Sequence, residues 1–86
     1  MRIGFDLAKD SSNLAKHGVS LALAEQFDWL TGVVQPARTV GSESRWKMLV
    51  ALEGIVYAVI FTRRADVLWI ISLRHASRKE RREYAR

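Results

Sequence analysis

Cysteine is absent from the 86 residues, and proline occurs only once, as Pro36. Without cysteine the chain forms no disulfide and has no thiol nucleophile or thiolate metal ligand, which suits a reducing compartment. No repeat, low-complexity segment or Pro/Gly-rich linker divides the sequence, and its length supplies apolar material for one core. We therefore expect residues 1–86 to form a single domain.

Long hydrophobic runs are also missing. The two longest, GIVYAVIF and VLWIISL, are far shorter than the roughly 20 residues that a membrane span needs. Asp6, Lys9 and Asp10 place charge within the first ten positions, which excludes a secretory signal there. These features predict a cytoplasmic protein with no membrane association.

Positive charge is concentrated in the last part of the sequence. The chain has 14 Lys and Arg against 9 Asp and Glu, a formal net charge of +5. Residues 74–86 hold six basic and two acidic side chains, so only +1 remains for the other 73 positions. A local basic patch of this kind favours polyanions, meaning nucleic acid, an anionic membrane face or an acidic protein.

Capping residues predict two helices in the first third of the chain. Asp6 can cap a helix over about residues 7–16, and Gly18 stands where a left-handed C-terminal cap is expected. Ser20 can cap a second helix over about residues 21–30. Both helices have apolar positions with which to cover a sheet.

Three apolar runs after Pro36 predict strands, with the segment before them read as a strand end and a loop. The runs are RWKMLVAL, IVYAVIFT and VLWIISLR, at residues 45–52, 55–62 and 67–74. The turns between them are so short that neighbouring strands must be antiparallel. The last two runs are apolar at nearly every position, so we expect helices to cover both sheet faces. The predicted fold is α+β: two N-terminal helices, an antiparallel sheet of three to four strands, and a basic C-terminal helix.

The basic tail is expected to be a helix that starts directly after the last strand. The segment SRKE matches a capping box, with Ser77 as N-cap and Glu80 three residues later. Arg78 and Arg82 then share a helix face, where like charges cost roughly 0.2–0.5 kcal/mol unless an anion offsets them. The alternative is a solvated face softened by the acidic neighbours. Arg74, at the end of the strand, favours anion binding, since arginine forks bind phosphate bidentately.

Two pairs of residues elsewhere are candidates for acid–base chemistry. Lys16 and His17 end the first predicted helix, where a histidine can act as general base or acid near neutral pH or can simply cap the helix dipole. Glu43 and Arg45 lie before the first long strand and form either a salt bridge or part of a catalytic site. With two histidines, no cysteine and scattered carboxylates, no metal site and no cofactor are expected.

Taken together, FDLAKDSSNLAKHGVS, ARTVGSESRW, VIFTRR and IISLRHASRKERREYAR resemble the BrnT family of toxins from type II toxin–antitoxin systems. The resemblance covers nearly the whole chain in order. Its most specific parts are the N-x-x-K-H-G-V element at 13–19 and the I-I-S-x-R-x-A-[ST]-R-x-E-R-x-x-Y element at 70–84.

This resemblance implies a RelE-like fold and a metal-independent ribonuclease that cleaves RNA through the 2′-hydroxyl and inhibits translation. It also implies a hetero-oligomer with a BrnA-like ribbon-helix-helix antitoxin, through which alone the complex would contact operator DNA. Carried over residue by residue, the resemblance gives catalytic positions at Lys16, His17, Glu43, Arg45, Arg74 and Arg78, and RNA-binding positions at Arg63 and Arg82.

Within that site the resemblance suggests that Arg74 and Arg78 hold the phosphate and that either His17 or Glu43 is the base. The sequence departs from the family at His75, where a second arginine is usual, and in lacking a tryptophan before the first aspartate. A protein that uses the same basic face only to bind nucleic acid or a partner remains the alternative.

Overall fold

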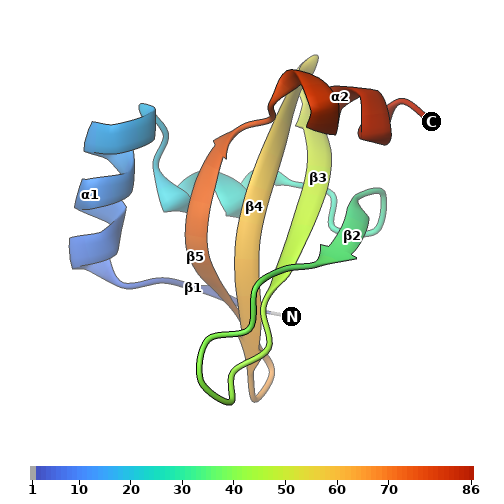
Figure 1. The fold of residues 1–86 in the computed structure, drawn as a ribbon. Helices are drawn as coiled ribbons and strands as arrows, with labels where there is room; N and C mark the ends of the chain where they lie inside the picture. Colours follow the sequence, from blue (N-terminus) through green and yellow to red (C-terminus); the bar gives the residue numbers. More distant parts are fainter. Residues whose placement is uncertain (1) are drawn as a thin grey trace.

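The computed structural model describes residues 2–86, and Figure 1 shows the course of the chain. In chain order the elements are β1 (Arg2–Gly4), α1 (Leu7–His17), the 3₁₀ helix η1 (Leu21–Gln26), β2 (Val33–Pro36), β3 (Trp46–Leu52), β4 (Ile55–Arg64), β5 (Val67–His75) and α2 (Arg78–Tyr84). The α+β class, the first helix and the helical tail are confirmed. None of the helices formed by these residues is both long and apolar enough to cross a membrane.

Residues 2–86 form a sheet of five strands in the order β1-β5-β4-β3-β2, one strand more than the largest number expected. The neighbours β2, β3, β4 and β5 pair antiparallel, as predicted. The prediction of a purely antiparallel sheet is wrong, because β1 pairs in parallel with β5 over three residues. A strand this short has no periodic pattern of its own, and its partner lies at the other end of the sequence.

Both predicted hairpin turns are present. Glu53 and Gly54 have φ of 51° and 81°, which matches a two-residue turn with both central residues in the left-handed region. Ala65 has φ of 53° in the two-residue connection between β4 and β5. These tight turns align β3, β4 and β5 side by side and so fix which side chains meet across the sheet.

Local side-chain bonds fix the ends of α1. The Asp6 carboxylate accepts the backbone N–H groups of Ala8 and Lys9, and Gly18 closes the helix with φ of 73°. The N-terminal cap and the left-handed C-terminal cap therefore both form as predicted.

The second predicted helix differs from expectation. Ser20 caps it, but residues 21–26 form a 3₁₀ helix in place of an α-helix over 21–30. The Asp28 side chain accepts the N–H of Leu30 at 3.0 Å, which makes a turn. Asp side chains that bond nearby backbone groups compete with helix formation, so the helix ends before Asp28.

The two faces of the sheet are unlike. One face packs against η1, which lies behind the strands in Figure 1, and forms the hydrophobic core. The core residues are Val19, Leu21, Ala24, Phe27, Met48, Val50, Tyr57, Val59, Phe61, Ile70 and Leu73. We call the opposite face, which carries Lys47, Ile60, Ser72 and Arg74, the open face. The expectation that helices cover both faces holds only in part, because α2 covers only the end of this face where β5 finishes.

The register between β4 and β5 shifts by one residue within the sheet. Ser72 pairs with Ile60, whereas Ile70 pairs with the next residue of β4, Phe61. Ile71 is therefore the extra residue of a β-bulge in β5. A bulge of this kind reverses the alternation of side chains for the rest of the strand.

The bulge decides which side chains of β5 reach the open face. Both Ile70 and Leu73 are buried in the core, three positions apart, although regular alternation would put them on opposite faces. Arg74 consequently projects from the open face, and His75 projects from the core face. The abrupt step from apolar strand to basic tail thus places Arg74 on the less covered side of the sheet.

Candidate functional site

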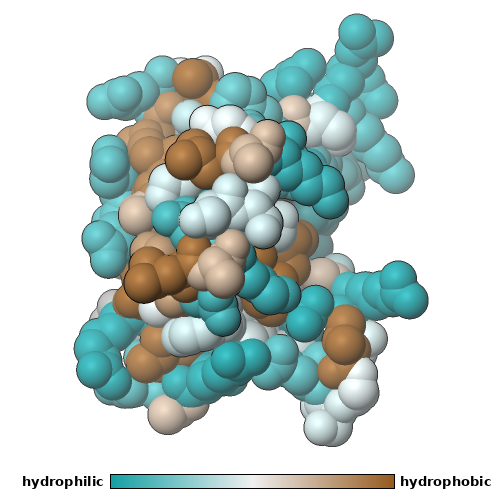
Figure 2. Space-filling model, turned by 90° about the vertical axis from the view of Figure 1, so that its left-hand side faces the viewer, coloured by the Kyte–Doolittle hydropathy of each residue, from teal (hydrophilic) through white to brown (hydrophobic). Residues whose placement is uncertain are grey.

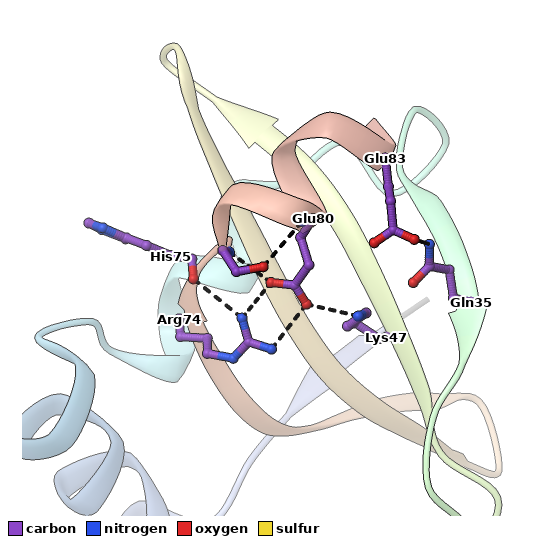
Figure 3. Close-up of polar contacts among 7 residues, drawn as sticks. Gln35, Lys47, Arg74, His75, Glu80 and Glu83 are labelled. Carbon is purple, nitrogen blue, oxygen red and sulfur yellow. Dashed lines mark hydrogen bonds and ion pairs between the residues drawn. The ribbon is translucent and has the colours of Figure 1, made fainter. Parts of the chain in front are cut away.

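The densest polar contacts on the open face join Arg74, Lys47 and Glu80 (Figure 3). The Arg74 guanidinium donates to both Glu80 carboxylate oxygens, from Nη1 to Oε1 at 2.6 Å and from Nη2 to Oε2 at 3.1 Å. Lys47 Nζ donates to Oε2 at 2.8 Å. Because β5, β3 and α2 supply one residue each, two cations from separate strands meet on one carboxylate.

Glu80 also completes the predicted capping box of α2. Its Oε1 accepts the N–H of Ser77 at 2.8 Å, and Ser77 Oγ accepts the N–H of Glu80 at 3.1 Å. The Glu80 side chain is only 6% exposed. The alternative, in which this glutamate softens a solvated helix face, does not hold for Glu80, since its side chain faces inward to Arg74 and Lys47.

The charges in this cluster stabilise one another. The hydrogen bonds from Arg74 hold the pKa of the Glu80 carboxyl far below its usual range, with further help from Lys47 and the Ser77 N–H, while burial opposes the shift. The carboxylate in turn raises the pKa of Arg74. Glu80 is thus ionised at any physiological pH and, with such a low pKa, is a poor general base.

A second group of charges lies around Glu43. This carboxylate accepts from Arg64, with Nε to Oε2 at 3.2 Å and Nη2 to Oε1 at 3.5 Å. The guanidinium of Arg64 also lies 4.9 Å from the ring centre of Trp69 on β5. Arg45 Nε lies 3.8 Å from Glu43 Oε1, and within residues 2–86 this buried nitrogen has no hydrogen-bond partner.

A hollow of about 500 Å³ adjoins Arg45. Residues 37–41 of the loop between β2 and β3 form one wall, and Ile60 on the open face contributes to the floor. Arg38 lines the same hollow, so two arginines border it. This arrangement favours an anionic ligand that extends from the sheet toward the loop.

Lys16 and His17 lie at the opposite edge of the sheet. They line a shallow hollow of about 360 Å³ together with Ser72 and other residues of α1 and β5. Asn13 fixes this part of α1 to the strand, because its side chain donates to the Leu73 carbonyl at 2.7 Å and accepts the Leu73 N–H at 3.2 Å. The hollow meets the open face at Ser72.

The remaining predicted residues are Arg63 on β4 and two arginines on α2. Arg63 pairs with Leu68 on the core side of the sheet and donates to the Ala65 carbonyl at 3.3 Å, so it points away from Arg74. Arg78 and Arg82 are exposed on α2.

His75 lies on the core side too. Its ring is edge-on to Tyr57, with ring centres 5.3 Å apart, and Figure 3 shows it directed away from the cluster of Arg74 and Glu80. The departure from the family pattern at this position therefore falls outside the open face.

The open face gathers basic groups between two raised borders. Seen from the side of α1, the outline of the molecule is indented between the part that carries α2 and the part that carries loop 37–41 (Figure 2). The register places Ser72, Ile60, Lys47 and Gln35 in one row across the sheet, from the hollow beside Lys16 to β2. A single-stranded polyanion laid along this row would meet Lys16 at one end and Lys47 further along.

Several members of this site were not predicted from the sequence. Lys47 and Glu80 meet across 33 positions, which no local motif shows. Arg64, rather than Arg63, reaches the open face, and strand alternation could have identified it if the phase of β4 had been assigned. The predicted residues Arg45 and Arg74 lie on the open face, Lys16 and His17 lie at its edge, and Glu43 stands near Arg45.

The sequence and the fold of this chain are similar to those of known proteins. Residues 5–80 match the model of a family described as the ribonuclease toxin BrnT of type II toxin–antitoxin systems. The structure is similar to the crystal structure of the Brucella abortus ribonuclease toxin BrnT, with a TM-score of 0.75 and 34% sequence identity over 91% of this chain and 99% of that one. A search of curated protein sequences found no significant match.

Proposed function

The chain belongs to the BrnT family of ribonuclease toxins of type II toxin–antitoxin systems, and from this premise we propose that it cleaves RNA on the open face without a metal ion. The observation that carries the proposal is the pair of cations, Arg74 and Lys47, held side by side by one buried carboxylate. Such preorganised donors stabilise negative charge that develops on a phosphate during the reaction. The positive charge needed in the transition state is therefore available from side chains.

The proposed reaction is attack of the ribose 2′-oxygen on the adjacent phosphorus. A base removes the 2′-hydroxyl proton as the new P–O bond forms, and the bond to the 5′-oxygen breaks as that oxygen gains a proton. The products are a 2′,3′-cyclic phosphate and a 5′-hydroxyl. Arg74 and Lys47 bind the non-bridging oxygens, Arg78 and Arg45 support neighbouring charge, and Arg82 holds flanking backbone.

Two residues are candidates for the general base. His17 borders the open face beside Ser72, whereas Glu43 stands at the other border and accepts hydrogen bonds from Arg64. Single-turnover cleavage by His17→Gln and Glu43→Gln distinguishes them, because only loss of the base removes proton abstraction from the 2′-hydroxyl.

The fold and partners proposed here follow from the family. We place the chain among RelE-like toxins that inhibit translation in the cytoplasm. A BrnA-like ribbon-helix-helix antitoxin would form a hetero-oligomer with it and provide the only contact with operator DNA. Acidic side chains of that antitoxin would lie against the exposed arginines of α2, Arg78 and Arg82, because complementary charge steers association.

The direct test uses purified protein and a short labelled RNA in the presence of EDTA. We expect cleavage that ends in a cyclic phosphate, and no cleavage when the same RNA carries 2′-O-methyl groups. Arg74→Lys, purified identically, controls for contaminating nucleases and should cut at least about 10-fold more slowly, because lysine lacks the planar fork. Binding without cleavage in all buffers would instead support the alternative of a non-catalytic module, and activity that needs added Mg²⁺ would refute the metal-free mechanism.

A further inference from the structure

Every hydrogen-bonding position of the Glu80 carboxylate is occupied. Oε1 accepts from Arg74 Nη1 at 2.6 Å and from the Ser77 N–H at 2.8 Å. Oε2 accepts from Lys47 Nζ at 2.8 Å and from Arg74 Nη2 at 3.1 Å. Four donors therefore converge on one side chain, and none of its oxygens is left to accept a proton from a substrate.

The two cations are more exposed than the carboxylate that joins them. Side-chain exposure is 35% for Arg74 and 22% for Lys47, against 6% for Glu80. A guanidinium has five N–H groups and an ammonium has three, so both residues keep donors that Glu80 does not use. Glu80 lies beneath Arg74 and Lys47, and the N–H groups of these two cations that Glu80 does not use are available from the open face.

We infer that Glu80 is a positioning residue of the ribonuclease site, whose carboxylate holds Arg74 and Lys47 together so that their unused N–H groups form a seat for one RNA phosphate. This inference rests on the proposed function and adds to it the residue that positions its two phosphate-binding cations. Without the carboxylate, two like charges at close range repel, and each long side chain regains rotamer freedom. The seat would then have to be assembled by the substrate itself, at a cost in rate.

Glu80→Gln separates this role from support of the helix. Glutamine keeps the volume and the oxygen that accepts the Ser77 N–H, so the capping box persists. Its amide nitrogen, however, replaces Oε2 and faces two donors, Lys47 Nζ and Arg74 Nη2. The variant should therefore release Lys47 and one of the two bonds from Arg74 while α2 stays in place.

Two control variants reproduce the changes in net charge and in helix stability that could accompany Glu80→Gln. Glu83→Gln makes the same change in net charge on the same helix, at a residue whose contact is a 3.4 Å bond with Gln35. Ser77→Ala removes the hydroxyl that caps α2 and so weakens the helix, yet it keeps the Glu80 carboxylate. The first controls for charge and the second for stability.

The experiment measures single-turnover cleavage at saturating protein, together with affinity for a 2′-O-methyl RNA that cannot be cut. For Glu80→Gln we expect a cleavage rate lowered by about 10- to 100-fold, with affinity within about threefold of wild type. Both controls should keep rates within about threefold of wild type. Such a split between rate and affinity is what misplacement of phosphate ligands predicts, whereas loss of general electrostatic attraction would lower affinity first.

The inference is overturned if Glu80→Gln cuts as fast as Glu83→Gln, or if Ser77→Ala loses as much rate as Glu80→Gln. If circular dichroism shows that Glu80→Gln is unfolded at the assay temperature, Lys47→Gln decides instead, since it removes one cation and leaves Arg74 on its carboxylate. A rate unchanged in Lys47→Gln would overturn the two-cation seat, and a loss of at least about 10-fold would support it. If the wild-type protein itself cuts no RNA, the proposed function is refuted as well. If the wild type cuts RNA and Glu80→Gln cuts equally fast, only the positioning role of Glu80 is refuted.

Discussion

Replacement of Asn13 by alanine should destabilise the fold strongly, although Asn13 belongs to a surface helix. Its side chain is buried and bonds both backbone groups of Leu73, with Nδ2 also donating to the Val19 carbonyl at 2.8 Å. β1 pairs with β5 only up to Trp69, so Leu73 has no strand on that side. The Asn13 amide takes the place of the missing strand and attaches α1 to the sheet.

The expected decrease in the free energy of unfolding follows from the three backbone groups that lose a hydrogen-bond partner in Asn13→Ala. At about 1 kcal/mol of net stability for each hydrogen bond, the loss is about 3 kcal/mol. A domain of this size changes its melting temperature by about 4–8 °C for each kcal/mol, so we expect a decrease of roughly 12–24 °C. Because total stabilities are only about 5–15 kcal/mol, this loss is a large share.

Thermal unfolding followed by circular dichroism measures the effect, with Ser12→Ala as the matched control. Ser12 neighbours Asn13 on α1, is exposed, and bonds only the Ala8 carbonyl within the helix at 3.3 Å. Its replacement should change stability by no more than about 0.5 kcal/mol. A melting temperature of Asn13→Ala within about 3 °C of that control would refute the view that this amide attaches α1 to β5.

Two further predictions concern charge. The lowered pKa of Glu80 means that its ionised form stabilises the fold above the unfolded-state pKa near about 4.3, and that this contribution is lost as pH falls toward the folded-state value. The melting temperature of the wild type should thus decrease more between about pH 5 and pH 3 than that of Glu80→Gln, and equal slopes in calorimetry would contradict the sign. In RNA binding measured at several salt concentrations, Arg64→Ala should reduce the salt slope by roughly 0.7–1, and Arg63→Ala, on the core side, should leave it unchanged. Equal effects of Arg64→Ala and Arg63→Ala on the salt slope would contradict the expectation that RNA binds the open face rather than the core side of the sheet.

The features that the sequence predicted well are those set by neighbouring residues. The caps at Asp6, Gly18 and Ser77 depend on side chains within a few positions, and each forms as expected. The hairpin turns likewise depend on short connections between long apolar runs. The shortened second helix at 21–26 shows the limit of such signals, because a single turn at Asp28 outweighed an apolar helical pattern.

The features that the sequence did not predict depend on pairing between distant segments. β1 forms because residues 2–4 meet β5, and a three-residue segment has no pattern that indicates this. In the site, the density of arginine indicated the tail and Arg74, and the structure places Arg74 on the open face against Glu80. It did not identify Lys47, a lone lysine in a strand whose role depends on its distance from Glu80 in space.

The β-bulge at Ile71 connects these local and distant effects. With regular alternation along β5, Ile70 and Arg74 would lie on one face, and an arginine would enter the core or an isoleucine would leave it. The extra residue lets Ile70 and Leu73 both pack inside while Arg74 reaches Glu80 and Lys47 on the open face. Because β1 pairs with β5 only as far as Trp69, the backbone of Leu73 lies at the sheet edge, where Asn13 binds it and brings the end of α1, with Lys16 and His17, to the edge of that face. One irregular residue in the strand therefore sets the face on which Arg74 lies, and the short pairing of β1 leaves the edge to which the helix bordering that face is attached.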